Sequence, residues 1–268
     1  HQTWAWSRWG NIPLVRYFAL QVRLEVRRVA AYISCHRSFG LFLRSTGVKR
    51  DSNMATNNVT LYYIHDPMCS WCWGFRSTWQ QLQQNLSSVI EVTYLVGGLA
   101  ADTDQPMPIA MQQSLAATWQ RIQQHIPGTQ FNYDFWNPSS NTQPRRATYP
   151  SCRAVLAAKA QQPSSEQAMI EAIQQVYYLQ AKNPANLDVL TAVAETIDLQ
   201  PDQFLQDITS PAIEQEFLRQ LAQARQLSNQ GFPSLVLKHG NSHHAIPLDY
   251  NNSQTMKQAI LTIINPQQ

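Results

Sequence analysis

The chain has 268 residues but only four cysteines, Cys35, Cys69, Cys72 and Cys152. Cysteines this few and this scattered exclude a small secreted scaffold held together by several disulfides. They also argue against a structural zinc site, because the Cys69–Cys72 pair would need two further ligands and no second Cys-x-x-Cys exists. His65 and Cys152 would supply them only if the fold happened to bring them together. The closely spaced pair therefore carries the chemical signal.

Charge is scarce as well, at 14% of the residues, and no apolar run approaches the roughly 18 residues of a membrane span. The formal net charge of +3 is unevenly distributed. Residues 1–53 hold 9 Lys and Arg against 2 acids, or +7, whereas residues 54–268 hold 11 against 15, or −4. The longer part has no basic stripe interleaved with aromatics, which argues against nucleic-acid binding. We expect neither a nucleic acid nor a membrane as partner.

Residues 1–53 differ in character from the rest of the chain. They lack an initial Met, and arginines interrupt each apolar run, so the uninterrupted apolar segment of a secretory signal peptide is missing. An Arg-rich, acid-poor segment also suits an organellar transit peptide or a basic helix at a membrane surface. Because Met54 is followed by a short polar stretch and a strand pattern, we interpret residues 1–53 as an unstructured or non-native extension. We then expect a cytoplasmic protein, with no signal peptide ahead of Met54.

Hydrophobic periodicity predicts an α/β protein. Strand patterns at 59–65 and 90–96 flank a helix pattern at 70–86, which makes a right-handed βαβ unit. Strands at 234–238 and 242–248 and a helix at 253–264 end the chain. Between these two ends, helices are predicted at 108–126, 151–160, 165–181, 187–197 and 211–228. The ends must meet in one sheet, so we predict a thioredoxin-type domain (57–100 plus 229–265) interrupted by an inserted all-helical domain (101–228).

The sequence Cys69-Ser70-Trp71-Cys72 lies where the predicted helix at 70–86 begins. Cysteines at i and i+3 share one face of a helix, and their Cα separation of about 5–6 Å is one that a disulfide can bridge. The first cysteine would lie at the helix N-terminus, where unpaired N–H groups and the helix dipole favour a thiolate. We interpret the pair as a reversible dithiol.

Three segments together resemble a known family. They are Asp-Pro-Met-Cys-Ser-Trp-Cys-Trp-Gly-Phe at 66–75, Gly-Phe-Pro-Ser at 231–234 and, more weakly, Cys-Arg-Ala-Val at 152–155. The chain resembles the DsbA-like thiol–disulfide oxidoreductases over 57–265, and in particular their FrnE-like or 2-hydroxychromene-2-carboxylate isomerase-like branch. The resemblance implies that Cys69 is the nucleophile, that Cys72 resolves the mixed disulfide, and that Pro233 is a cis-proline facing the dithiol. Phe232 would turn its backbone toward the cysteines.

Further positions near the dithiol are candidates for substrate binding or redox tuning. We expect Ser70 to donate a hydrogen bond to the nucleophilic thiolate and Trp71 to offer an apolar contact surface. His65 either stabilises the thiolate or is a structural histidine. Cys152 is either a small buried hydrophobe or a resolving or regulatory thiol. The aromatic segment 132–136 is either a packing patch between domains or part of a substrate groove.

These features favour a thiol–disulfide oxidoreductase of the protein disulfide reductase or isomerase type. It would act on protein or small-thiol disulfides with a thiol redox partner, and would need no metal or organic cofactor. In a reducing cytoplasm the dithiol would be mostly reduced. One alternative is a glutathione-dependent isomerase or kappa-type glutathione transferase, with glutathione as co-substrate, although such enzymes typically have a serine where this chain has Cys69. Another is a non-enzymatic redox-sensing or binding module.

Overall fold

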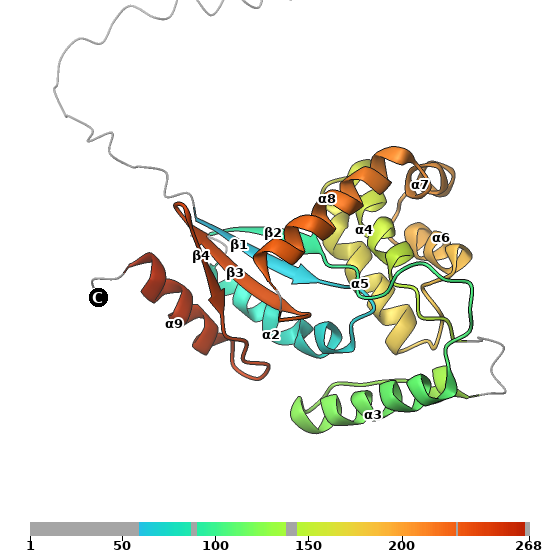
Figure 1. Cartoon of the computed structure of the whole chain (residues 1–268), viewed down its shortest axis with the longest axis horizontal. Coiled ribbons are helices and arrows are strands. Elements are labelled where there is room, and N and C mark those ends of the chain that lie inside the picture. Colours follow the sequence, from blue (N-terminus) through green and yellow to red (C-terminus); the bar gives the residue numbers. More distant parts are fainter. Residues whose placement is uncertain (1–58, 87–89, 138–143, 229, 266–268) are drawn as a thin grey trace, which may run out of the picture. The chain divides into compact units, whose positions relative to one another are not determined.

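The computed structural model describes residues 59–86, 90–137, 144–228 and 230–265, so the predictions for residues 1–53 and Cys35 lie outside it. The strands form a four-stranded mixed sheet in the order β2-β1-β3-β4 (Figure 1). β1 (Val59–His65) pairs in parallel with β2 (Glu91–Val96) and antiparallel with β3 (Ser234–His239). β3 pairs antiparallel with β4 (Ser242–Ile246). The two ends of the predicted α/β fold therefore meet in one sheet, as expected.

Each helix predicted from periodicity is present. The helices of the described residues are α2 (Ser70–Leu86), α3 (Ile109–His125), α4 (Tyr149–Gln161), α5 (Ser165–Tyr178), α6 (Leu187–Thr196), α7 (Pro201–Ile208), α8 (Pro211–Leu227) and α9 (Ser253–Ile264), with a 3-10 turn, η1 (Tyr133–Trp136). The turn η1 lies within the aromatic segment 132–136.

The prediction omitted α7, because it treated Pro201 only as a boundary between helices. Proline is well suited to the first turn of a helix, where its missing N–H has no partner to lose. Phe204 and Ile208, four residues apart, are both buried where α7 packs on α4 and α6. A helix this short depends on such packing for its stability.

Two other element ends differ from the prediction. α5 ends at Tyr178 rather than at Ala181, because Ala181 has a φ of +54° and so cannot continue a right-handed helix. β4 ends at Ile246 instead of continuing to 248, since its pairing with β3 stops there. Neither change alters the order of the elements.

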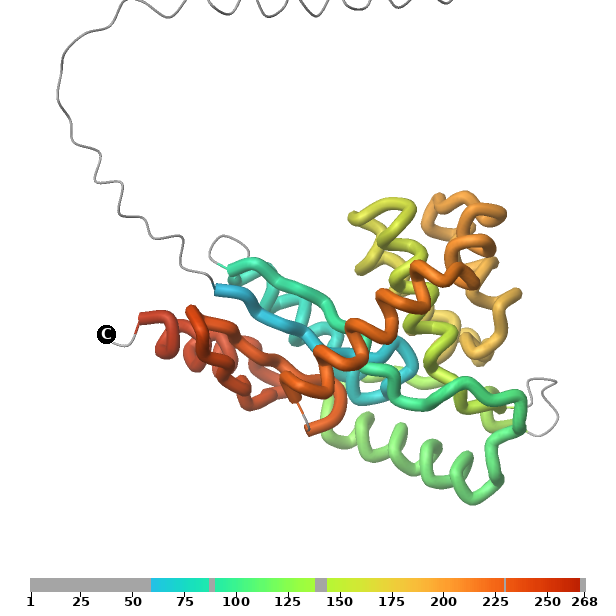
Figure 2. Tube along the Cα trace, turned by 45° about the horizontal axis from the view of Figure 1, so that its top comes forward, coloured from blue at the N-terminus to red at the C-terminus, as the bar shows by residue number. Residues whose placement is uncertain are grey.

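Side chains of β1 alternate between the two faces of the sheet, and helices cover both faces. Leu61 belongs to a core cluster that includes residues of α2 and α9, whereas Ile64 packs with Ala224 of α8. Figure 2 shows α8 running across the sheet. Because α8 packs on both β2 and α4, it joins the helices between β2 and β3 to the sheet. The division into two domains at 101 and 228 stays a prediction.

Candidate active site

A short turn after β1 places Cys69 at the start of α2. The Asp66 carbonyl accepts a hydrogen bond from the Cys69 N–H at 3.0 Å, and the Asp66 carboxylate accepts one from the Met68 N–H at 2.8 Å. The Cys69 carbonyl accepts the N–H of Trp73 at 3.1 Å, as the first turn of the helix begins. Helix N–H groups and the helix dipole favour a thiolate at this position.

The two cysteines of this turn have unequal surroundings. Both are free thiols, and Cys69 is 6% exposed whereas Cys72 is 1% exposed. The Cys69 thiol donates to the carbonyl oxygen of Phe232 at 3.4 Å. Burial raises the pKa of the Cys72 thiol well above its usual value, and the neighbouring Cys69 raises it further. Cys72 therefore keeps its proton more firmly than an ordinary thiol does.

Phe232 and Pro233 approach the dithiol from the start of β3. The Phe232–Pro233 peptide bond is cis, as the family resemblance implied, and Pro233 is buried. The Phe232 ring packs against Gly97 so closely that a Cβ on Gly97 would lie 1.9 Å from a ring carbon. The ring is thus held at the end of β2 while the Phe232 carbonyl faces Cys69.

A cleft of about 220 Å³ opens beside Cys69. It is lined by Met68, Cys69, Ser70, Trp71, Leu99, Leu115, Thr118, Trp119, Arg146, Thr148, Tyr177 and Phe232. Most of these side chains are apolar, and Arg146 is the single charged residue in the set. Its size and composition suit a small ligand or a short segment of chain next to the Cys69 sulfur.

Ser70 and Trp71, two of the candidates for substrate binding or redox tuning, line the cleft together with Cys69. Trp71 is half-buried, and its ring lies against Tyr250 and His125 with centroid distances of 5.2 Å and 5.9 Å. Within the described residues, the buried Ser70 side chain has no hydrogen bond, so a bond to a Cys69 thiolate stays a prediction.

The structure does not bring His65 into this cleft. Its side chain is fully buried, its ring stacks on Tyr63 at 5.2 Å, and Tyr94 meets it edge-on at 5.8 Å. Neither ring nitrogen has a hydrogen-bond partner among the described residues. Burial lowers the pKa of His65 to about 3. At neutral pH His65 is therefore uncharged and packs beneath the site.

Asp66 is a residue of the site that the sequence interpretation did not single out. Its buried carboxylate accepts hydrogen bonds from the Leu99 N–H at 2.7 Å and the Thr148 hydroxyl at 2.6 Å, and the Cys152 thiol donates to it at 3.6 Å. Burial raises the pKa of Asp66, and these hydrogen bonds oppose that rise. Asp66 thereby ties the start of α4 and the segment after β2 to the dithiol turn. An Asp-Pro pair directly after a strand was the available signal.

Cys152 donates one of the hydrogen bonds that the Asp66 carboxylate accepts. It is fully buried, and both burial and the charge of Asp66 raise the pKa of its thiol. This environment fits the interpretation of Cys152 as a small buried side chain. A resolving or regulatory role for it stays untested.

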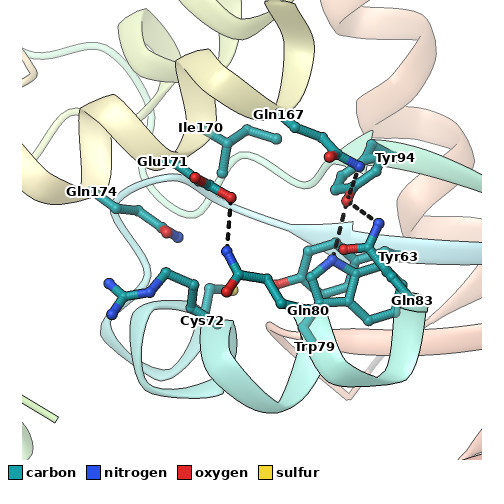
Figure 3. Close-up of a pocket in the computed structure, with 11 residues that line it drawn as sticks. Tyr63, Cys72, Trp79, Gln80, Gln83, Tyr94, Gln167, Ile170, Glu171 and Gln174 are labelled. Atoms are coloured by element: carbon teal, nitrogen blue, oxygen red, sulfur yellow. Dashed lines mark hydrogen bonds between the residues drawn. The ribbon is translucent and has the colours of Figure 1, made fainter. Parts of the chain in front are cut away.

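A second, smaller hollow lies on the other side of the dithiol (Figure 3). It has a volume of about 30 Å³ and lies between α2 and α5. Its lining includes Cys72, Tyr63, Arg76, Glu171 and the side chains of Gln80, Gln83, Gln167 and Gln174. Gln80 donates to the Glu171 carboxylate at 2.9 Å, as the dashed line in Figure 3 marks. Cys72 thus borders a cavity whose wall combines these polar side chains with the aromatic and aliphatic side chains of Trp79, Tyr94 and Ile170.

The aromatic segment 132–136 contributes to packing. Phe135 is fully buried in a cluster with Trp73, Trp119, Tyr177 and Tyr178, and Tyr133 and Trp136 pack against that cluster. Because Trp119 and Tyr177 also line the cleft, this cluster supports its floor. Across the residues that the structure describes, no group of three or more His, Cys, Asp or Glu could hold a metal ion.

With this geometry in hand, comparison with known proteins assigns the family. The model of a family described as Thioredoxin matches residues 62–258, and the chain belongs to this family. The α/β fold with helices inserted between β2 and β3, predicted from the sequence, is thereby confirmed.

Among solved structures, the chain is similar to one from Nitrosomonas europaea that is provisionally described as a protein disulfide isomerase. The two are 25% identical with a TM-score of 0.68, over 78% of this chain and 99% of the other. The cytosolic disulfide reductase DsbM of Pseudomonas aeruginosa is 23% identical with a TM-score of 0.63, over 77% and 99% of the two chains, and shows the same fold.

A curated relative, the ClpXP adapter protein SpxH of Shouchella clausii (strain KSM-K16), is 21% identical over 202 residues. That match covers 74% of this chain but 65% of the relative, which is less than two thirds of its length. In the described part of the chain, none of the helices is both long enough and apolar enough to cross a membrane.

Proposed function

We propose that this protein is a thiol–disulfide oxidoreductase of the reductase or isomerase type, with Cys69 as nucleophile and Cys72 as resolving thiol. The observation that carries the proposal is the Cys69 thiol at the start of α2, directed at the Phe232 carbonyl beside a cleft. Cys72, buried and with a raised pKa, suits the second step rather than the first. Membership of the thioredoxin family supports the assignment.

The reaction begins when Cys69 loses its proton and its thiolate attacks one sulfur of a substrate disulfide. The substrate S–S bond breaks, a mixed disulfide forms on Cys69, and the departing thiolate takes a proton from water. Cys72 then loses its proton and attacks the Cys69 sulfur, which releases the second substrate thiolate. The substrate gains two electrons, and the dithiol is oxidised to the Cys69–Cys72 disulfide.

The Phe232 carbonyl and the neighbouring cleft would position the substrate for this attack. A backbone carbonyl next to the nucleophilic sulfur can accept a hydrogen bond from an extended substrate segment. The apolar side chains of Trp71 and Trp119 would contact the groups that flank the substrate disulfide.

Glutathione is the reductant that we propose for the oxidised protein. Two glutathione thiols would reduce the Cys69–Cys72 disulfide and leave as glutathione disulfide. The same neighbour, DsbM, has also been solved with GSH, at 22% identity and a TM-score of 0.61 to this chain. We further propose that the protein works in the cytosol, the compartment in which DsbM is described.

The test is reduction of insulin disulfides by the full chain with glutathione as reductant. Cys69→Ser should reduce the rate to that of glutathione alone. Cys72→Ser should leave a Cys69–glutathione mixed disulfide that mass spectrometry detects, because the resolving step is lost. Cys152→Ser is the matched control and should keep most of the activity.

A rate that Cys69→Ser leaves unchanged would overturn the proposal. A glutathione-dependent isomerase or kappa-type transferase would instead bind glutathione and keep its activity when Cys72 is replaced.

A further inference from the structure

Arg146 is a cation that lines the cleft beside Cys69. Among the described residues, its guanidinium has no ion pair and no hydrogen bond. The preceding Arg145 is engaged instead, because it donates to the Ala185 carbonyl and, at 3.0 Å, to Asn186 Oδ1. Arg153 likewise pairs with two carboxylates. Arg146 is thus left available to a ligand.

The positive charge of Arg146 acts on Tyr177, another residue that lines the cleft. Burial raises the pKa of the Tyr177 hydroxyl, and the positive charge of Arg146 opposes that rise. Arg146 and Tyr177 both line the cleft that holds Cys69.

None of the described residues that line the cleft is a carboxylate, and the nearby Asp66 carboxylate already accepts hydrogen bonds from Leu99, Thr148 and Cys152. The surrounding walls are formed largely by Leu99, Leu115, Trp119 and Tyr177, and apolar walls strengthen the field of a nearby charge. A guanidinium in such a place is matched by a planar anion that accepts two parallel hydrogen bonds, as a carboxylate does.

The size of the cleft restricts the ligand further. At about 220 Å³ it is smaller than the roughly 300–1,000 Å³ of a typical site for a drug-sized ligand. It would therefore enclose only the part of a ligand that lies next to the Cys69 sulfur. The ligand that these observations favour reacts at that sulfur and carries a negative charge near Arg146.

We propose that Arg146 binds a carboxylate of the small-thiol disulfide that reacts at Cys69, and so makes this cleft select carboxylate-bearing disulfides over neutral ones. This inference rests on the proposed thiol–disulfide exchange at Cys69. It adds to it a residue that determines specificity and the chemical class that the residue accepts. Arg146 acts on the bound group and takes no part in the exchange itself.

The experiment measures how fast the reduced full chain is oxidised by two disulfides of similar reactivity. Glutathione disulfide carries carboxylates, whereas 2-hydroxyethyl disulfide is neutral. Free thiols remaining after an acid quench give the second-order rate constant for each. Arg146→Gln should lower the constant for glutathione disulfide about tenfold, since a charge-assisted hydrogen bond is lost, and leave the neutral probe unchanged.

Two further variants separate binding from structure. Arg146→Lys should recover part of the rate with glutathione disulfide, because the charge remains but the two-pronged geometry is lost. Arg225→Gln, which removes an exposed arginine of α8 that does not line the cleft, should match the unsubstituted chain with both probes. Added salt should slow the reaction of the unsubstituted chain with glutathione disulfide and leave its reaction with 2-hydroxyethyl disulfide unchanged.

The inference is overturned if Arg146→Gln lowers both rate constants equally, because Arg146 would then only shape the cleft. It is overturned as well if both constants are unchanged. Failure of the proposed function looks different: the unsubstituted dithiol would then react with neither probe.

Discussion

Cys69 and Cys72 lie one helical turn apart, yet the two hollows that they border have no lining residue in common. The hollow at Cys69 is a cleft of about 220 Å³ whose one charged residue is Arg146, and the hollow at Cys72 is a cavity of about 30 Å³ where Arg76, Glu171 and several glutamines lie among aromatic side chains. The two thiols also differ in burial, since Cys72 is less exposed than Cys69. One turn of helix is thus enough to give two identical side chains different chemistry. In the function that we propose, the cleft side would contact the substrate, and burial would keep Cys72 protonated until the second step.

The largest effect that we expect is the loss of stability when His65 is protonated. The His65 ring stacks on Tyr63, which lines the hollow at Cys72. In the folded state it is neutral, with a pKa lowered from 6.5 to about 3, whereas the unfolded chain binds a proton below pH 6.5. Stability is therefore lost as the pH falls from 6.5 toward 3. By linkage, the loss amounts to about 3 kcal/mol at pH 4.5. His65→Phe should remove this part of the acid destabilisation, as urea unfolding at pH 7 and pH 4.5 would show.

His243→Gln, at an exposed position of β4, is the control and should leave the pH dependence unchanged. If the His65→Phe variant loses as much stability on acidification as the unsubstituted chain, then protonation of His65 is not a cause of the acid destabilisation.

A smaller effect is expected on the cleft side from Gly97→Ala. The new Cβ would lie 1.9 Å from the Phe232 ring, so the ring must shift, and we expect the Phe232 carbonyl that accepts from Cys69 to shift with it. Overpacking of this kind costs about 2 kcal/mol. Urea unfolding should show the loss, and oxidation of the dithiol by 2-hydroxyethyl disulfide should become slower.

Gly74→Ala makes a fair comparison, because its Cβ would also crowd a neighbour, the flexible end of Ile126 at 2.7 Å, but away from Phe232. It should leave the oxidation rate almost unchanged. Equal rates for the two variants would show that the position of the Phe232 carbonyl does not matter for the reaction.

The smallest effect measures the difference between the two thiols directly. At pH 7, iodoacetamide should alkylate Cys69 more than about tenfold faster than Cys72, because the thiolate is the reactive form and the raised pKa of Cys72 keeps it protonated. Mass spectrometry of the digested protein after short exposures gives both rates. Cys152, also buried with a raised pKa, should react as slowly as Cys72. Equal rates at Cys69 and Cys72 would remove the basis of the comparison.

Local patterns were sufficient for much of the fold. Alternation and three-to-four periodicity predicted the strands that form the sheet and most of the helices. The omission of α7 has a physical cause: its two buried residues stabilise it only through contacts with α4 and α6. A short helix that depends on distant partners leaves little trace in its own sequence.

The site was predictable in one part and not in another. Cys69, Cys72, Phe232 and Pro233 belong to short motifs, and the structure brings all four together. Asp66 escaped notice because nothing in the sequence says that a carboxylate there will be buried. Its partners Leu99 and Thr148 come from segments that only folding brings near.

The sequence by itself determined the dithiol, its place at the start of a helix and the α/β order of elements, because these depend on neighbours within a few positions. Tertiary structure alone decided which sulfur faces the cleft and that His65 is neutral. It also decided that Arg146 has no ion pair or hydrogen bond with any residue that the structure describes. Burial and the distance between charges set those properties. Both depend on residues far apart in the chain, and the packing of α3 on α2, of α4 on α5 and α8, and of α8 on β2 establishes them.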